Sequence, residues 1–192
     1  MVDAPQLEPG QLSRGTAVIA HPHPLFGGTM ENKVVQTLAR AFVQSGWQAV
    51  RFNFRGVGAS QGTYDEGRGE LQDLLAVAAQ RATGDLALAG FSFGAFVTSQ
   101  AAAQLATQRP LSSLVLIGTA ASRFAVAAIP EDLHPRTLVV HGEQDDTVPL
   151  SDVMNWARPQ KLPVTVIPGV EHFFHGQLPL LRSLVARHLA AT

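Results

Sequence analysis

Gly90-Phe91-Ser92-Phe93-Gly94 joins two stretches of different character. An apolar run at 86–89 precedes it, and an alanine-rich run without glycine or proline follows it at 95–105. The first is typical of a buried strand and the second of a helix. A serine at such a joint, with glycine two positions to either side, fits a turn too tight for larger side chains. The sequence therefore predicts that the serine hydroxyl stands clear of a sheet, at a helix N-terminus that favours developing negative charge.

Strands and helices are expected to alternate along the rest of the chain. Short apolar runs predict strands, and apolar residues at helical spacing predict helices between them. The expected strands cover 16–20, 48–54, 86–89, 114–117, 137–141 and 164–167, and the expected helices cover about 32–45, 69–81, 95–105, 151–157 and 178–189. Short, uniformly apolar strands separated by helices indicate an α/β domain with a parallel sheet covered on both faces.

Length and composition limit the class of protein. The chain has 192 residues, which fits one domain over 1–192, and residues 1–15 are expected to form a loose N-terminal arm with at most a short edge strand. The net charge is −1 without a basic run, so neither a nucleic acid nor a membrane is expected as partner. Cysteine is absent, which excludes thiolate chemistry and disulfides. Neither a signal peptide nor a run of roughly 18 apolar residues is present, so we expect a soluble cytoplasmic protein.

Polar residues just past the strand ends carry the candidate chemistry. Ligands of a parallel sheet bind outside the carboxyl ends of its strands, where Ser92 and the loops 141–149 and 169–176 are expected. These supply a serine, then acids, then histidines. A serine hydroxyl is a poor nucleophile until an imidazole takes its proton, and the imidazole needs a carboxylate to fix its tautomer. The pattern therefore indicates nucleophilic catalysis by serine.

Three stretches give the sequence a specific resemblance. They are His-Pro-His-Pro-Leu-Phe-Gly-Gly at 21–28, Arg-Phe-Asn-Phe-Arg-Gly-Val-Gly-Ala-Ser at 51–60 and Gly-Phe-Ser-Phe-Gly at 90–94. Over roughly 16–190 the chain resembles small α/β-hydrolases of the lidless bacterial serine-esterase type. The resemblance implies a three-layer sandwich whose mostly parallel sheet has about six or seven strands, without a lid domain.

The resemblance also implies the site residues. Ser92 would be the nucleophile, His172 the general base and Asp145 the acid. Asp146 is the rival acid, but the superfamily pattern His-Gly-x-x-Asp-x-x-Val-Pro has its acid four residues after the histidine, which is Asp145. His175 is the rival base, and His172 is favoured because it is nearer the strand end and matches Gly-x-x-His.

An oxyanion hole needs two backbone N–H groups that point at the tetrahedral oxygen. One is expected from Phe93, directly after the nucleophile, and the other from the loop after the first strand. Pro22 and Pro24 in that loop have no N–H to donate. By analogy with related enzymes, His23 is the first candidate for the second donor and Leu25 the next.

Two further patterns point away from a metal or a cofactor. His21 and His23 have a proline between them and no third ligand at clear spacing, so a buried structural role is favoured for His21. The glycine-rich loop 56–62 follows a strand but is not G-x-G-x-x-G. A tight turn anchored by Arg55 is therefore expected there, and neither a metal nor a cofactor is expected.

The segment 118–136 is too short for a cap domain. Larger relatives place a helical lid between the corresponding strands, whereas these roughly twenty residues can supply only a short helix or flap. The site is therefore expected to be open. The resemblance implies hydrolysis of small-molecule carboxylic esters with short acyl chains through an acyl-enzyme. The alternatives are thioester, amide or peptide cleavage by the same residues, or a catalytically silent binding module on this fold.

Overall fold

A computed structural model describes residues 1–6, 8 and 10–192. Within these residues, seven strands form one sheet in the order β1-β3-β2-β4-β5-β6-β7. The strands are β1 Val2–Asp3, β2 Gly15–Ala20, β3 Gln48–Arg51, β4 Asp85–Phe91, β5 Ser113–Ile117, β6 Thr137–Gly142 and β7 Thr165–Ile167. The short edge strand β1 runs antiparallel to β3, and the other neighbouring strands pair in parallel. The predicted sheet and number of strands are confirmed.

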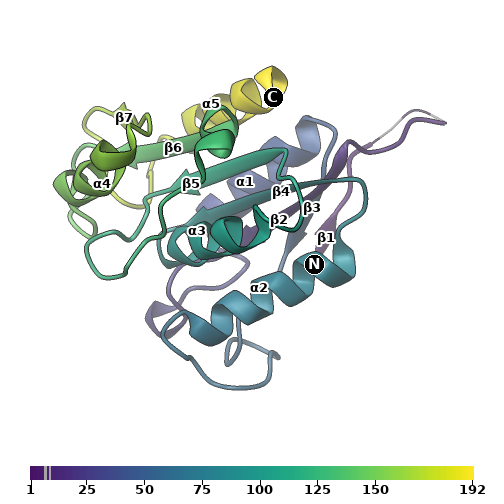
Figure 1. Cartoon of the computed structure of the whole chain (residues 1–192), viewed down its shortest axis with the longest axis horizontal. Helices are drawn as coiled ribbons and strands as arrows, with labels where there is room; N and C mark the ends of the chain where they lie inside the picture. Colours follow the sequence, from purple (N-terminus) through teal and green to yellow (C-terminus); the bar gives the residue numbers. More distant parts are fainter. Residues whose placement is uncertain (7, 9) are drawn as a thin grey trace.

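Helices cover both faces of the sheet (Figure 1). They are α1 Lys33–Gln44, α2 Arg68–Arg81, α3 Phe93–Leu105, α4 Leu150–Ala157 and α5 Leu178–Ala191, with the 3₁₀ turns η1 Pro24–Phe26, η2 Glu131–Arg136 and η3 Arg158–Gln160. Helices α1 and α5 pack on one face, and α2, α3 and α4 pack on the other. The three-layer arrangement predicted from the sequence is therefore confirmed.

The central strands are buried on both faces. Successive side chains of a strand point to opposite faces of its sheet. Val18 and Leu88 join the core beneath α2 and α3, whereas Ile19 and Ala89 join the core beneath α1 and α5. These strands are uniformly apolar because neither face of the central sheet meets water.

The strand predicted over 48–54 ends earlier, at Arg51. The Phe54 N–H donates to the His21 ring Nε2 at 3.1 Å instead of to a neighbouring strand. The Asn53 side-chain oxygen accepts from the Met30 N–H at 2.8 Å. The backbone of Phe54 thus binds a side chain in place of a neighbouring strand, and the chain leaves the sheet after Arg51. In the predicted N-terminal arm, Val2–Asp3 forms the edge strand, while residues 7 and 9 lie outside the described residues.

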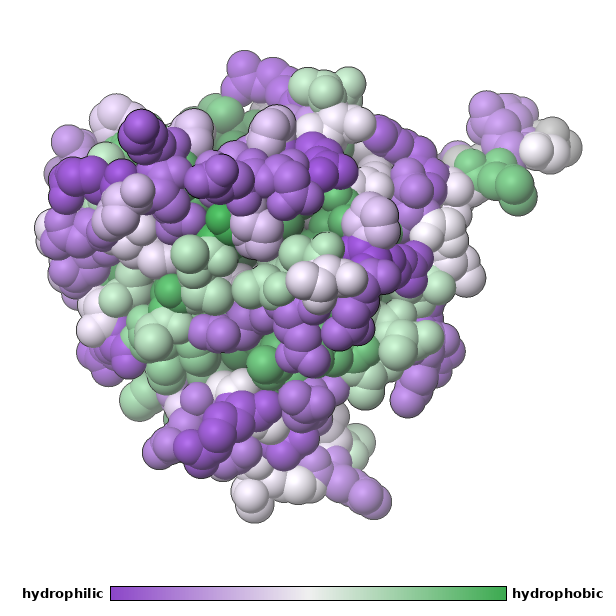
Figure 2. Space-filling model, viewed as in Figure 1, coloured by the Kyte–Doolittle hydropathy of each residue, from purple (hydrophilic) through white to green (hydrophobic). Residues whose placement is uncertain are grey.

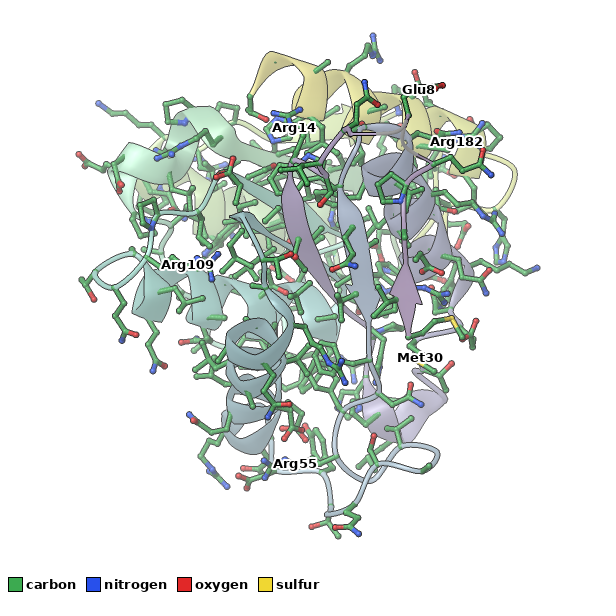
Figure 3. The ribbon with its side chains drawn as sticks, turned by 90° about the vertical axis from the view of Figure 1, so that its right-hand side faces the viewer. Glu8, Arg14, Met30, Arg55, Arg109 and Arg182 are labelled. Atoms are coloured by element: carbon green, nitrogen blue, oxygen red, sulfur yellow. The ribbon has the colours of Figure 1, made fainter. Side chains whose placement is uncertain are left out.

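The motif at 51–60 holds elements together. The buried Arg51 guanidinium donates to Asp3 at 2.7 Å and to Glu31 at 3.1 Å, which joins β1 and the start of α1 to β3. Arg55, which Figure 3 labels, forms an ion pair with Asp73 of α2 at 2.8 Å. The predicted anchoring of the glycine turn by Arg55 is confirmed.

The surface mixes polar and apolar residues. Figure 2 shows hydrophilic residues above and below a more apolar band on one face. Across the part of the chain that the structure describes, no helix combines the length and apolar character needed to cross a membrane. Leu25, Phe26 and Phe173 are among the exposed large hydrophobic residues.

Candidate active site

Ser92 lies in a strained turn between β4 and α3. Its φ of 57° and ψ of −117° lie outside the regions that most residues adopt. A Cβ at Gly90 would come 2.4 Å from the Gly94 carbonyl oxygen, and one at Gly94 would come 2.4 Å from the Ala20 carbonyl oxygen. The two glycines are therefore required by close backbone approach, as predicted. The Ser92 N–H donates to Ile117 at 2.8 Å, which fixes the turn against β5.

Three loops bring the predicted triad residues into contact. Ser92 Oγ lies 3.0 Å from His172 Nε2, and His172 Nδ1 lies 2.6 Å from Asp145 Oδ2. The loops follow β4, β7 and β6, whose carboxyl ends share one edge of the sheet. Only 8% of Ser92 and 2% of His172 are exposed, so the pair is shielded from most solvent. A hydroxyl, an imidazole and a carboxylate in this order can activate the serine oxygen.

Asp145, and not Asp146, faces the imidazole. Its Oδ1 accepts from the Thr147 N–H at 3.0 Å and the Val148 N–H at 2.7 Å, which leaves Oδ2 to His172. Asp146 is exposed, and its carboxylate accepts from the Thr147 hydroxyl. The rival histidine, His175, is also exposed and pairs with Glu171 at 3.0 Å.

Two residues that support the site were missed in the sequence. Gly118 has φ 53°, and a Cβ there would come 3.2 Å from Cε1 of the His172 ring. His141 is buried beneath Asp145, with Nε2 2.9 Å from the Val148 carbonyl oxygen and 3.4 Å from Asp145 Oδ2. Burial lowers the pKa of His141, so the neutral ring carries its proton on Nε2 and donates to Val148. The available signals were position, because Gly118 directly follows β5 and His141 lies at the end of β6, and the His-Gly-x-x-Asp-x-x-Val-Pro pattern, which begins at His141.

The two residues expected to supply the oxyanion-hole N–H groups, Phe93 and His23, line the same cleft as Ser92. Among the described residues, neither of their backbone N–H groups donates a hydrogen bond within the protein. The Leu25 N–H, by contrast, donates to the His23 ring at 3.2 Å, and Leu25 is 66% exposed. The geometry therefore favours His23 over Leu25 as the second donor.

His21 has the structural role that the sequence favours. Its Nδ1 lies 2.6 Å from the Pro22 carbonyl oxygen, and its Nε2 accepts from Phe54. Burial lowers the pKa of His21 to about 4, so the ring is neutral at pH 7. Both ring nitrogens are engaged, which leaves no lone pair for a metal. Within the described chain, no cluster of three or more His, Asp or Glu side chains is placed to hold a metal ion.

An open cleft of about 390 Å³ surrounds the Ser92 hydroxyl. Its walls are largely aromatic, with four phenylalanines and the His23 ring. The lining residues are Pro22, His23, Phe26, Gly27, Gly28, Asn32, Ser92, Phe93, Ala120, Arg123, Phe124, Thr147, Val148, His172 and Phe173. A volume of this size suits a small molecule with apolar groups.

The segment 118–130 forms one wall and is fixed in place. The Ala125 carbonyl oxygen accepts from the Gln100 side chain at 2.7 Å, and the Ala127 carbonyl oxygen accepts from Trp156 Nε1 at 3.1 Å. The Ile129 N–H donates to Gln160 at 2.8 Å. The prediction that no lid domain is present is confirmed. The short helix expected within 118–136 is η2, Glu131–Arg136, and side chains of α3, α4 and η3 bind the backbone of residues 125–129.

The strand order, together with a serine elbow after β4 and no domain inserted over it, defines a lidless serine hydrolase of the α/β-hydrolase superfamily. Residues 5–125 match the sequence model of the X-Pro dipeptidyl-peptidase (S15) family. Because this match covers more than half of the chain, the protein belongs to that family.

Related proteins agree with this class. An α/β serine hydrolase without a lid from Xanthomonas campestris is 39% identical, with a TM-score of 0.85 over 98% of this chain and 86% of the other. An α/β serine hydrolase homologue from Coxiella burnetii is 41% identical, with a TM-score of 0.80 over 98% and 90%. An uncharacterised protein of Rickettsia prowazekii is 34% identical and covers 82% of this chain and 71% of its own.

Proposed function

We propose that this hydrolase cleaves small carboxylic esters through an acyl-enzyme, with Ser92 as nucleophile, His172 as general base and Asp145 as the acid. The observation that carries the proposal is the continuous contact from Ser92 Oγ through the His172 ring to Asp145 Oδ2, at 3.0 and 2.6 Å, inside an open cleft. We further propose a soluble small-molecule substrate, which the small cleft supports, and a cytoplasmic location, with which the absence of cysteine agrees.

The geometry supports a two-step acyl transfer. His172 takes the proton of Ser92 as the serine oxygen attacks the ester carbonyl, and Asp145 stabilises the imidazolium that forms. The N–H groups of Phe93 and His23 stabilise the oxyanion. His172 then protonates the leaving alcohol, and a water molecule repeats the sequence to release the acid. A cleft open to solvent gives that water direct access.

The charge of the cleft favours an ester over an amino-terminal dipeptide. A dipeptidyl-peptidase must bind a free α-ammonium group, which calls for a carboxylate partner. Among the described residues that line the cleft, none is an aspartate or a glutamate. The nearby Asp145 carboxylate already accepts three hydrogen bonds, from His172, Thr147 and Val148. The family match nevertheless makes peptide cleavage the second candidate.

Replacement of the nucleophile tests the proposal. Ser92→Ala should lower the turnover of 4-nitrophenyl butyrate by at least about 10³-fold, since the oxyanion hole alone gives little catalysis. The melting temperature should stay within about 3 °C of the wild type, because one buried hydroxyl is lost. Ser122→Ala, an exposed serine near the cleft, is the matched control and should keep full activity. Undiminished turnover in Ser92→Ala would contradict the proposal.

A comparison of substrates tests the bond that is cleaved. We expect kcat/KM for 4-nitrophenyl butyrate to exceed that for glycyl-proline 4-nitroanilide and for a butyryl thioester. A higher value for the anilide would favour peptidase function, and a higher value for the thioester would favour a thioesterase. A fluorophosphonate probe that labels the wild type but not Ser92→Ala would show an activated serine and exclude a silent binding module.

A further inference from the structure

The cleft carries one permanent charge. Among its described lining residues, Arg123 is the only lysine or arginine, and aspartate and glutamate are absent. Burial lowers the pKa of His23, so that ring is neutral at pH 7. Arg123 is therefore the one permanent charge among the described lining residues, and it is positive although the net charge of the protein is −1.

Arg123 has no acidic partner among the described residues. No carboxylate there lies within 4.0 Å of its guanidinium, which also holds for other arginines of the chain, but among the described residues Arg123 alone of these lines the cleft. Glu70, the acid whose charge also acts on His23, is fully buried and accepts from two backbone N–H groups. The guanidinium of Arg123 is thus available to an outside anion.

The backbone that carries Arg123 is fixed. The Phe124 N–H donates to the Ala120 carbonyl oxygen at 3.2 Å, and the Phe124 ring stacks on Phe96 with a centroid distance of 4.8 Å. Gln100 holds the next residue, Ala125, at 2.7 Å. An arginine that only improves solubility would not need a fixed place in a cleft wall. After burial, the charge of Arg123 also contributes to the lowered pKa of His23 in the same cleft.

The chemistry of a guanidinium indicates what it would bind. Its planar set of N–H donors matches a carboxylate, with which it forms paired hydrogen bonds. The aromatic rings of Phe26, Phe93 and Phe124 line the same cleft and suit an apolar or aromatic group. The combination fits a small substrate with one anionic end.

We infer that Arg123 determines specificity and that the substrates are monoanionic esters, which combine an apolar or aromatic body with one carboxylate group. This inference rests on the ester hydrolysis proposed above. Arg123 touches neither Ser92 nor the ester carbonyl in this scheme, so it selects the substrate and is not a catalytic residue.

Two pairs of esters test the inference, because the carboxylate can lie on either side of the bond. The first pair is 4-nitrophenyl valerate and mono(4-nitrophenyl) glutarate, in which a carboxylate replaces the terminal methyl of the acyl chain. The second pair is 4-nitrophenyl acetate and 5-acetoxy-2-nitrobenzoate, in which the carboxylate is on the leaving group. The uncatalysed hydrolysis of each ester is subtracted, and kcat/KM is measured at low and high salt.

We expect the wild type to prefer the anionic member of at least one pair by about tenfold at low salt, and less at high salt because ions screen an exposed charge. Arg123→Gln should remove the preference, which is the ratio of kcat/KM for the anionic ester to that for its neutral counterpart. Arg123→Lys should keep part of the preference, because the charge remains without the paired donors.

Arg187→Gln is the matched control. It removes the same charge from an exposed position of α5 next to His188, which contacts Ser113 at the start of β5 and so lies at the sheet edge opposite Ser92. The inference is wrong if neither pair shows a preference, if the preference persists in Arg123→Gln, or if Arg187→Gln reduces it equally.

The outcome also separates this inference from the proposed function. Neutral esters that are cleaved in a Ser92-dependent manner, without any anionic preference, would overturn the role of Arg123 alone. A wild type that cleaves no ester, or a Ser92→Ala variant that still does, would overturn the proposed function and this inference with it.

Discussion

Gly118 gives the His172 ring the space that it occupies. A Cβ at this position would lie 3.2 Å from both the His172 ring and the Phe91 ring, at a positive φ of 53°. No larger residue could lie there without moving the imidazole or straining the backbone. The position of the proposed base is therefore set in part by a residue without a side chain.

Gly118→Ala should lower kcat/KM for 4-nitrophenyl butyrate by about tenfold or more, because small displacements of a catalytic group cost large factors in rate. Gly169→Ala is the matched control, since Gly169 has φ 70° but nothing within 4 Å of an added Cβ. Both variants should lose about 1 kcal/mol of stability from the left-handed backbone. Equal activity in the two variants would show that the contact with His172 is unimportant.

The residues that meet at the cleft differ in how well they can be predicted. Ser92, Asp145 and His172 each follow a strand closely, within motifs of recognisable spacing, so their contact could be predicted. Arg123 and Phe124 lie in a long loop whose path depends on side chains of α3 and α4. Such a path leaves no periodic signal in the sequence, and these two residues could not be placed in the cleft wall.

The first turn of helix α2 contains a buried acid, Glu70. Glu70 accepts from the Asp65 N–H at 2.9 Å and from the Gly67 N–H at 2.8 Å, so both carboxylate oxygens are used. A Cβ at Gly67 would come 2.4 Å from the Phe96 ring of α3. Glu70 thus fixes the loop that precedes α2, and this loop packs closely against α3 at Gly67.

Glu70→Gln should destabilise the protein by about 2 kcal/mol, since an amide nitrogen cannot accept and one buried N–H is left without a partner. The free energy of unfolding in urea measures the effect. Glu66→Gln removes the same charge from an exposed side chain one turn earlier and should cost less than about 0.5 kcal/mol. A similar loss in both variants would mean that charge, and not the buried hydrogen bonds, is responsible.

Most of the helices and strands can be predicted from the sequence. The helices and strands follow their apolar periodicity and end within two residues of the expected limits at most termini. The strand over 48–54 was predicted too long because Phe52 and Phe54 look like strand residues. The hydrogen bond from Phe54 to the His21 ring, 33 residues away, ends the strand, and such a distant contact is invisible to a local pattern.

The whole molecule contains buried histidines that are neutral at pH 7. Burial lowers the pKa of His21 to about 4, and burial also lowers the pKa of His141 and His188. His188 is half-buried, and its ring contacts the Ser113 hydroxyl at 3.1 Å. In the unfolded chain all three would titrate near 6.5. As the pH falls, these histidines therefore take up protons at a higher pH in the unfolded state than in the folded state.

Stability should consequently fall as the pH drops from about 6.5 towards 4, because the unfolded state binds more protons in this window. His21 alone accounts for of order 3 kcal/mol across the whole window, from a pKa that falls from 6.5 to about 4. Urea unfolding at several pH values gives the free energy of unfolding as a function of pH. The slope of this function should be shallower for His21→Gln than for the wild type, by an amount that corresponds to the uptake of up to one proton. An unchanged slope would mean that His21 does not titrate as its burial requires.

The hydrogen bonds that fix segment 118–130 have a consequence for the fate of an acyl group. This wall is held by Gln100, Trp156 and Gln160, so its movement across the cleft would break three hydrogen bonds. An acyl group on Ser92 would lie in the open cleft, which bulk water can enter, and water vastly outnumbers any other acceptor. Such a site is suited to breaking bonds and poorly suited to synthesis, so added alcohols should capture little of the acyl group as transesterification product.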